Sequence, residues 1–175
     1  MKLVPFSKLH FDDLSGWFPD EAAVVQWAGP TLSFPILAQE LQSMIEEGKA
    51  TKPSRLCWMT VSDATLVGHA QLGFDWRNGN ATLSRIAIAP QSRGKGLAVP
   101  MLKLVLKEAF GISEIQRIDL NVYTFNTPAI RTYERLGFVR EGVRRSSAKV
   151  GNQRWDTAIM GLLRDEWSRE MHCCG

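Results

Sequence analysis

The chain has 175 residues, of which 45% are hydrophobic and 22% are charged, and its formal net charge is +3. This length suits a single domain over residues 1–175, and the composition excludes a disordered or fibrous chain. Glycine, proline or charge interrupts every long apolar stretch, so we expect no transmembrane helix and no membrane partner. The N-terminus lacks the apolar core of a signal peptide, which favours a cytoplasmic protein.

Cysteine and histidine are too few and too scattered to predict a disulfide framework or a metal site. None of them shows the spacing of a zinc site, and Cys57 lies in an apolar run that is typical of a core position. We therefore expect no metal cofactor. The residues concerned are Cys57, Cys173, Cys174, His10, His69 and His172.

The first half of the chain predicts one short strand, short helical pieces and then antiparallel strands. Apolar residues at helical spacing predict a helix within residues 34–48, ended by Gly48. Asn78-Gly79-Asn80 is a strong hairpin signal between two strand patterns. The strands expected in this half cover residues 3–6, 56–61, 66–74 and 81–89.

The second half alternates helices and strands and ends in a hairpin about Gly151-Asn152. Thr127 and Pro128 predict the start of a helix, with Thr127 as its N-cap and Gly137 just beyond its end. The order of elements predicts an α/β (α+β) domain with three layers on a mixed sheet. The expected helices cover residues 97–110 and 127–136, and the expected strands cover 115–122, 138–149 and 153–162.

A glycine-containing loop at residues 90–96 joins a strand to a helix. Gly94 and Gly96 allow a close backbone approach, and Arg93 and Lys95 add positive charge near a helix N-terminus, which favours phosphate binding. The loop is neither a Walker A motif nor a Rossmann fingerprint. The alternative is a tight strand-to-helix turn with exposed basic residues. Pro100 is compatible with the helix only if it falls in the first turn.

Two motifs in this half resemble those of a known superfamily. Gln91-x-x-Gly94-x-Gly96, after a strand ending in Ile88-Ala89-Pro90, resembles the acyl-CoA signature of the GNAT N-acetyltransferases. Leu120-Asn121-Val122, followed by Asn126, Ala129, Tyr133 and Gly137-Phe138, resembles their second signature. The segment 156–167 is similar to the ribosomal-protein N-terminal acetyltransferase branch. The resemblance implies a three-layer GNAT-like fold, with a mixed, mostly antiparallel sheet, splayed central parallel strands and flanking helices.

The resemblance further implies an enzyme that moves an acetyl group from acetyl-CoA to a primary amine. Residues 56–163 would form the acyl-CoA-binding core, and residues 1–55 would lie on the acceptor side. Main-chain groups of the strand would hold the pantetheine arm, the loop would hold the pyrophosphate, and Asn126 would contact the arm. The implied cofactor-binding residues are Ile86, Ala87, Ile88, Gln91, Arg93, Gly94, Lys95, Gly96, Leu97, Ala98 and Asn126.

Tyr133 matches the position of a general acid near the thioester sulfur, and the alternative is a ring that only packs in the core. A phenol can return a proton to the leaving thiolate, and a main-chain N–H can stabilise the oxyanion. The general base is open, because Asn121 stands where some members have glutamate. Ser84, His69, Asp75 or an acid of the first 50 residues could act through water.

The acceptor is expected to be a small-molecule or peptide amine. Acids are in excess over the first 50 residues, Asp20 and Glu21 among them, and would attract a cationic amine such as a polyamine or a protein N-terminus. The alternative function is a non-catalytic CoA-binding sensor or assembly module. Nucleic acid is not expected, because Arg144 and Arg145 point to opposite faces of a regular strand. The terminal hairpin offers an edge for a possible homodimer.

Overall fold

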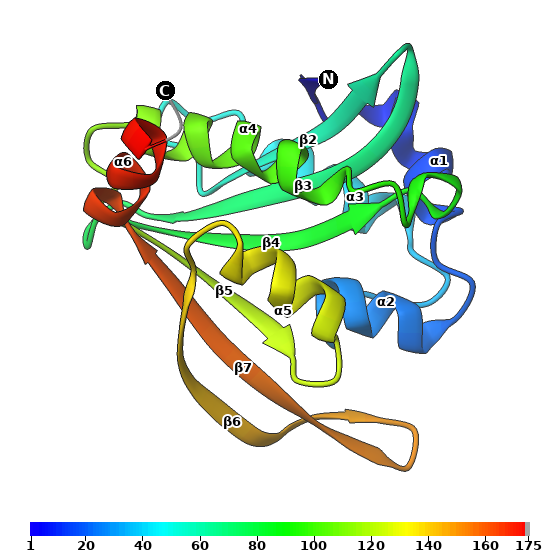
Figure 1. Ribbon diagram of the computed structural model, residues 1–175. Coiled ribbons are helices and arrows are strands. Elements are labelled where there is room, and N and C mark those ends of the chain that lie inside the picture. Colours follow the sequence, from blue (N-terminus) through cyan, green and yellow to red (C-terminus); the bar gives the residue numbers. More distant parts are fainter. Residues whose placement is uncertain (174–175) are drawn as a thin grey trace.

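A seven-stranded sheet forms the centre of the computed structural model, which describes residues 1–173 and the side chains of residues 1–168 (Figure 1). The strand order is β1-β2-β3-β4-β5-β7-β6, and only β4 and β5 run parallel. The predicted mixed, mostly antiparallel sheet is therefore confirmed. The strands are β1 (Lys2–Pro5), β2 (Arg55–Ser62), β3 (Thr65–Asp75), β4 (Asn80–Ile88), β5 (Arg117–Tyr123), β6 (Val139–Val150) and β7 (Gln153–Leu163).

Helices cover both faces of the sheet, which gives the three expected layers. On one face, α4, α5 and α6 bury a core that includes Leu72, Leu102 and Leu120. On the other face, α1, α2 and α3 bury a second core around Met44 and Met59. The helices are α1 (Phe11–Ser15), α2 (Glu21–Ala28), α3 (Ala38–Glu46), α4 (Ala98–Gly111), α5 (Thr127–Glu134) and α6 (Arg164–Cys173), and single turns cover Lys8–His10 and Pro90–Ser92.

The expected N-cap of α5 is wrong, and one helix was not expected. The N-cap of α5 is Asn126, whose side chain accepts a hydrogen bond from the Ala129 amide at 3.4 Å, and Thr127 is the first helical residue. Helix α6 was not expected, because its residues are strongly polar and its packing rests on Trp167 against Phe110. Cys174 lies outside the described residues, as do the side chains of His172 and Cys173.

The central parallel strands separate after a short paired stretch. Residues 80–83 of β4 pair with residues 117–120 of β5, and no ladder continues beyond Leu83 and Leu120 (Figure 1). Beside this point β4 carries a bulge against β3, where Arg85 adopts a left-handed φ of 49°. The free edge of β4 thus faces an opening between the strands, as the splayed arrangement requires.

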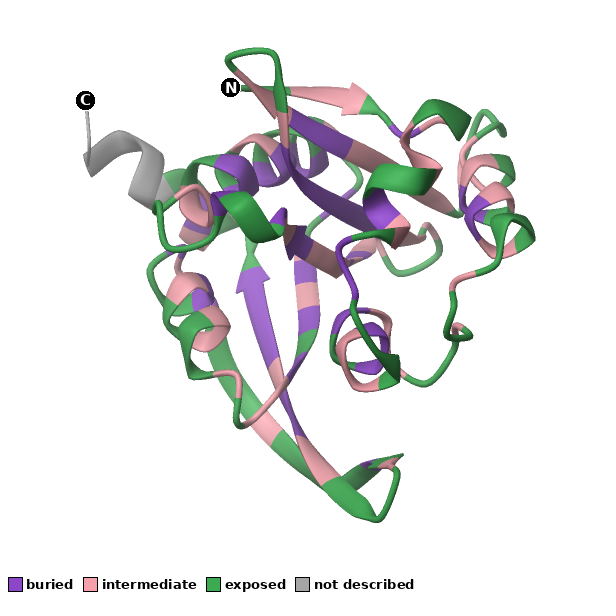
Figure 2. Ribbon diagram, turned by 90° about the vertical axis from the view of Figure 1, so that its right-hand side faces the viewer, coloured by how far each residue is buried: buried purple, intermediate pink, exposed green. Residues whose placement is uncertain are grey.

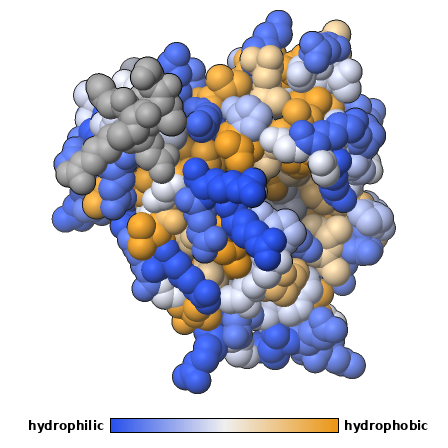
Figure 3. Space-filling model, in the orientation of Figure 1, coloured by the Kyte–Doolittle hydropathy of each residue, from blue (hydrophilic) through white to orange (hydrophobic). Residues whose placement is uncertain are grey.

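The terminal hairpin of β6 and β7 extends away from the body of the molecule. Most residues of β6 are exposed, as the green lower arm in Figure 2 shows. The space-filling view shows mainly hydrophilic residues over the same lower end (Figure 3). Strand β6 is the outer strand of the sheet, so its far edge pairs with no other strand of the described residues. Across the described residues, no helix combines the length and apolarity needed to cross a bilayer.

Candidate active site

Two cavities meet at the opening between β4 and β5. The smaller, of about 350 Å³, lies on the side of α4 and α5, and the larger, of about 690 Å³, lies on the side of α2. A group bound in one cavity can therefore reach a group bound in the other through the sheet. The residues that line both cavities are Gln26, Trp27, Leu83, Ser84, Arg85, Asn121, Val122 and Tyr123.

The smaller cavity brings together half of the predicted site residues. Ile86 and Ile88 point to it because they alternate with Ala87, which is buried in the core on the other face of the sheet. The loop residues Gln91 and 94–97 do not line this cavity and lie on the exposed approach to α4. The predicted residues on its wall are Ile86, Ile88, Arg93, Ala98, Asn126 and Tyr133.

The loop before α4 has the geometry of an anion cradle. Gly94 and Gly96 adopt φ values of 74° and 72°, which favour glycine. In the part of the chain that the structure describes, the amides of residues 94–98 donate to no protein acceptor. Arg93 is anchored by its Nε, which donates to the Ile88 carbonyl at 3.2 Å. Free amides, basic side chains and a helix N-terminus together favour a phosphate ligand.

Pro100 falls in the first turn of α4, as expected. Helix α4 begins at Ala98, so Pro100 is its third residue and lies in the first turn. An amide at that position has no partner within the helix, and the missing N–H of proline leaves the helical ladder complete.

Tyr133 lines the smaller cavity. Its side chain is only 7% exposed, and its ring packs edge-on against Phe138 with centroids 6.0 Å apart. Burial raises the pKa of the Tyr133 phenol above its ordinary value. The hydroxyl is therefore protonated throughout the neutral range, as a proton donor must be.

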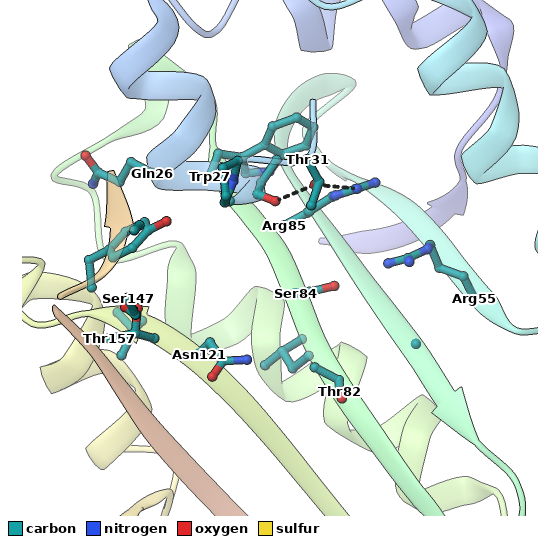
Figure 4. A pocket seen from close by; sticks show the side chains of 18 of the residues that line it. Gln26, Trp27, Thr31, Arg55, Thr82, Ser84, Arg85, Asn121, Ser147 and Thr157 are labelled. Atoms are coloured by element: carbon teal, nitrogen blue, oxygen red, sulfur yellow. Dashed lines mark hydrogen bonds between the residues drawn. The ribbon is translucent and has the colours of Figure 1, made fainter. Parts of the chain in front are cut away.

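The larger cavity is lined by the C-terminal end of α2 and by strands from both halves of the sheet. Arg55 and Arg85 bring their guanidinium groups to the same side of it, and Ser84 directs its hydroxyl into it (Figure 4). Among the described residues, no acid of the first 50 lines it. Asp20 instead caps α2 at the opposite end of the helix, where it accepts from the Ala23 amide at 2.8 Å. The acidic acceptor site expected from composition is therefore wrong.

The candidate bases occupy very different environments. His69 is fully buried, which lowers its pKa to about 4, and its Nδ1 lies 2.8 Å from the Arg85 carbonyl. Hydrogen bonds from Asn78 hold the Asp75 carboxylate in the β3–β4 turn and lower its pKa. Asn121 accepts a hydrogen bond from Arg144 at 2.6 Å. Of these residues, only Ser84 and Asn121 lie where the two cavities meet.

Several residues of the larger cavity have no signal in the sequence pattern. Arg85 reads as one exposed position of a regular strand, and only the bulge turns it toward the cavity. Gln26 and Trp27 belong to a short helix whose packing against the sheet decides what they face.

Known proteins share both the sequence pattern and the fold. Residues 21–138 match the model of the acetyltransferase (GNAT) family. The prophage-derived uncharacterized N-acetyltransferase YokL of Bacillus subtilis (strain 168) is 32% identical over 138 residues, which cover 78% of this chain and 77% of that protein. The spermine/spermidine N(1)-acetyltransferase of the same organism is 35% identical over 86 residues, which cover 46% of this chain and 57% of that protein.

A solved structure extends the likeness to nearly the whole chain. The spermidine N-acetyltransferase from Vibrio cholerae, in complex with CoA and spermine, superposes with a TM-score of 0.80 at 22% identity, covering 95% of this chain and 97% of that one. At this identity the likeness shows the fold, and the predicted three-layer architecture is confirmed. From the family match and the fold together, the chain belongs to the acetyltransferase (GNAT) family and is an acyl-CoA-dependent N-acetyltransferase.

Proposed function

We propose that this enzyme moves the acetyl group of acetyl-CoA to a small primary amine, with the donor in the smaller cavity and the acceptor in the larger one. The meeting of the two cavities at the opening between β4 and β5 carries the proposal. The relatives named for spermine and spermidine act on small amines, which supports a small acceptor rather than a folded protein.

The residues present fit acetyl-CoA. The unbonded amides of residues 94–98 and the side chains of Arg93 and Lys95 suit a pyrophosphate. Ile86 and Ile88 supply an apolar wall, and the free edge of β4 suits the amides of a pantetheine arm. Asn126 lines the same wall while it caps α5. When bound, acetyl-CoA supplies an acyl thioester activated toward amines.

Tyr133 is the general acid in this proposal. Its raised pKa keeps the phenol protonated, so it can donate a proton to the departing thiolate, whose conjugate acid has a pKa of about 8.5. The free edge of β4 beyond Leu83 offers main-chain N–H groups to the oxygen that becomes negative during attack.

The acceptor amine loses its proton through water rather than to a carboxylate. Among the described residues, none that lines both cavities is acidic, and Ser84 and Tyr123 are the ones there that carry a hydroxyl. The guanidinium of Arg85 beside the same opening disfavours a second positive charge. It therefore lowers the pKa of an amine placed there and increases the fraction that is neutral and nucleophilic.

We also propose that residues 1–55 shape the acceptor side of a single domain. The segment contributes Gln26 to Thr31, together with Ser54 and Arg55, to the wall of the larger cavity. Residues 56–163 contribute the remaining wall and the donor-binding loop.

The test is an acetylation assay on a pool of small amines, read by mass spectrometry of the products. The pool contains amino acids, polyamines, arylalkylamines and aminoglycosides, with short peptides as the competing class. In Tyr133→Phe we expect kcat to fall by about 100-fold, with unchanged affinity for acetyl-CoA. The control is Ser113→Ala, which also removes one hydroxyl but lies outside the lining of both cavities, and it should keep the activity.

Each outcome decides between the proposed function and its alternatives. A product from a small amine that falls in Tyr133→Phe supports the proposal. A product from peptides alone overturns the small acceptor. Bound acetyl-CoA without turnover of any amine favours the non-catalytic CoA-binding module.

A further inference from the structure

Positive charge dominates the larger cavity. Three arginines line it, on three different strands, and Asp75 is the one acidic residue among its described lining residues. Asp75 is exposed and is engaged by Asn78 in the turn. A ligand in this cavity therefore meets a net excess of guanidinium charge. The arginines are Arg55 on β2, Arg85 on β4 and Arg144 on β6.

Two of these arginines have no carboxylate partner. Among residues 1–168, no acidic oxygen lies within 4.0 Å of the Arg85 or Arg144 guanidinium. Arg85 reaches only the Thr31 hydroxyl, at 3.5 Å, and Arg144 donates to the neutral Asn121 amide. Arg55 differs, because its Nε pairs with Glu47 at 2.6 Å.

The surroundings of Arg85 favour an anion beside it. Its side chain is half-buried, and burial together with the nearby charge of Arg55 lowers its pKa, while the carboxylates of Glu47 and Glu40 act in the opposite direction. Two guanidinium groups on one wall repel each other, and an anionic ligand between them relieves that repulsion. The bulge fixes the backbone of Arg85, since His69 holds its carbonyl, so this cation is presented in a defined position.

We propose that the acceptor is a small amino acid, an amine that also carries a carboxylate, and that Arg85 binds this carboxylate with the support of Arg55 and Arg144. A guanidinium fork matches a carboxylate with two parallel hydrogen bonds. The same charges repel a polycationic amine, because Asp75, which Asn78 already engages, is the one acidic residue among the described lining residues. This inference rests on the proposed function and names the substrate class of the same site.

The first experiment uses the unmodified enzyme and matched acceptors. Phenylalanine, methionine and glutamine are each compared with their C-terminal amides, which keep the size and remove the charge. Phenethylamine and spermidine complete the set, and release of free CoA is measured for each. We expect kcat/KM for each amino acid to exceed that of its amide by about 10- to 100-fold, which is the range for one charge-assisted pair.

The second experiment changes the cation. In Arg85→Gln we expect KM for the amino acid to rise by about 10-fold or more, KM for acetyl-CoA to stay within about twofold, and the preference over the amide to disappear. Arg85→Lys keeps the charge but loses the fork, so it should retain part of the preference. Arg145→Gln is the matched control, because Arg145 follows Arg144 on β6 but does not line the cavity.

The outcomes separate this inference from the proposed function. If amides and spermidine are acetylated as well as or better than the amino acids, the carboxylate site is wrong while the small-amine acetyltransferase stands. If no amine is turned over, both proposals fail. If Arg85→Gln does not fold, two measurements still decide. They are the comparison of each amino acid with its amide on the unmodified enzyme, and the same comparison on the Arg144→Gln variant.

Discussion

The imidazole of His69 holds the backbone of Arg85. Its Nδ1 lies 2.8 Å from the Arg85 carbonyl oxygen, across the bulge that β4 makes against β3. A carbonyl oxygen only accepts, so Nδ1 carries a proton, and the pKa lowered by burial leaves the ring neutral near pH 7. Phe6 and Trp27 pack edge-on against the ring, with centroids 5.3 and 5.5 Å away. A buried side chain of one strand thus fixes the residue that carries positive charge into the larger cavity.

This arrangement predicts a pH-dependent stability. His69 has a folded pKa of about 4 against an ordinary value of 6.5, since burial disfavours the charged ring. Its contribution to the free energy of unfolding is complete above about pH 6.5 and is lost as the pH falls toward 4, because the unfolded chain binds the proton first. Urea unfolding should show a loss of roughly 2 to 3 kcal/mol from this residue between about pH 7.5 and pH 4.5.

The matched variant for this test is His69→Gln, which does not titrate and keeps an N–H donor near the Arg85 carbonyl. Its unfolding free energy should fall less than that of the unmodified protein over the same pH range. Equal pH dependence in both proteins would show that His69 is not held neutral.

The loop before α4 predicts that a substitution which strains its backbone weakens donor binding. In Gly94→Ala or Gly96→Ala a side chain is forced into a left-handed conformation, although no atom lies within 4 Å of the added carbon. The strain is about 1 to 2 kcal/mol, so KM for acetyl-CoA should rise by about 10-fold. Gly111→Ala, in an equally open position without a positive φ, is the control. An unchanged KM in the loop variants would place the donor elsewhere.

The absence of an acid among the described residues that line both cavities predicts a distinctive pH profile of activity. Because the amine loses its proton to water, kcat/KM should rise by about tenfold per pH unit up to the pKa of the acceptor itself. Acceptors whose amines differ in pKa should therefore give profiles displaced by the same difference. A bend at one pH for every acceptor would instead identify a base on the enzyme.

Substitution of Arg164, which lines neither cavity, is expected to lower the free energy of unfolding substantially. At the start of α6 its Nη1 donates to the Phe110 carbonyl and its Nε to the Ile115 carbonyl, each at 2.8 Å, and Nη2 donates to Ile112. These bonds satisfy carbonyls at and just beyond the end of α4. Arg164→Lys should lower the free energy of unfolding by about 2 kcal/mol, measured by urea unfolding. The exposed Arg135→Lys should leave it unchanged, and equal effects would contradict the role of Arg164.

Local sequence signals predicted the elements that hold the donor side. Asn78-Gly79-Asn80 turns between β3 and β4, Pro100 falls in the first turn of α4, and Gly94 and Gly96 adopt left-handed conformations. Each of these features depends on residues within a few positions of one another. Helix α6 was missed for the opposite reason, since its packing depends on contacts with residues far away in the chain.

Composition was misleading on the acceptor side. The acids of the first 50 residues raise the negative charge of that segment, yet the structure turns them away from the larger cavity, and arginines of β2, β4 and β6 line it instead. Charge in a segment does not tell which way its side chains point.

The sequence by itself determined the order of strands and helices as far as β7, the donor loop and the family, because short-range backbone preferences and motif spacing encode them. Only the tertiary structure decided the charge of the acceptor cavity. The separation of β4 from β5, the bulge at Arg85 and its tie to His69 arise from pairings between distant segments. Those pairings set which side chains face the opening, and no local pattern records them.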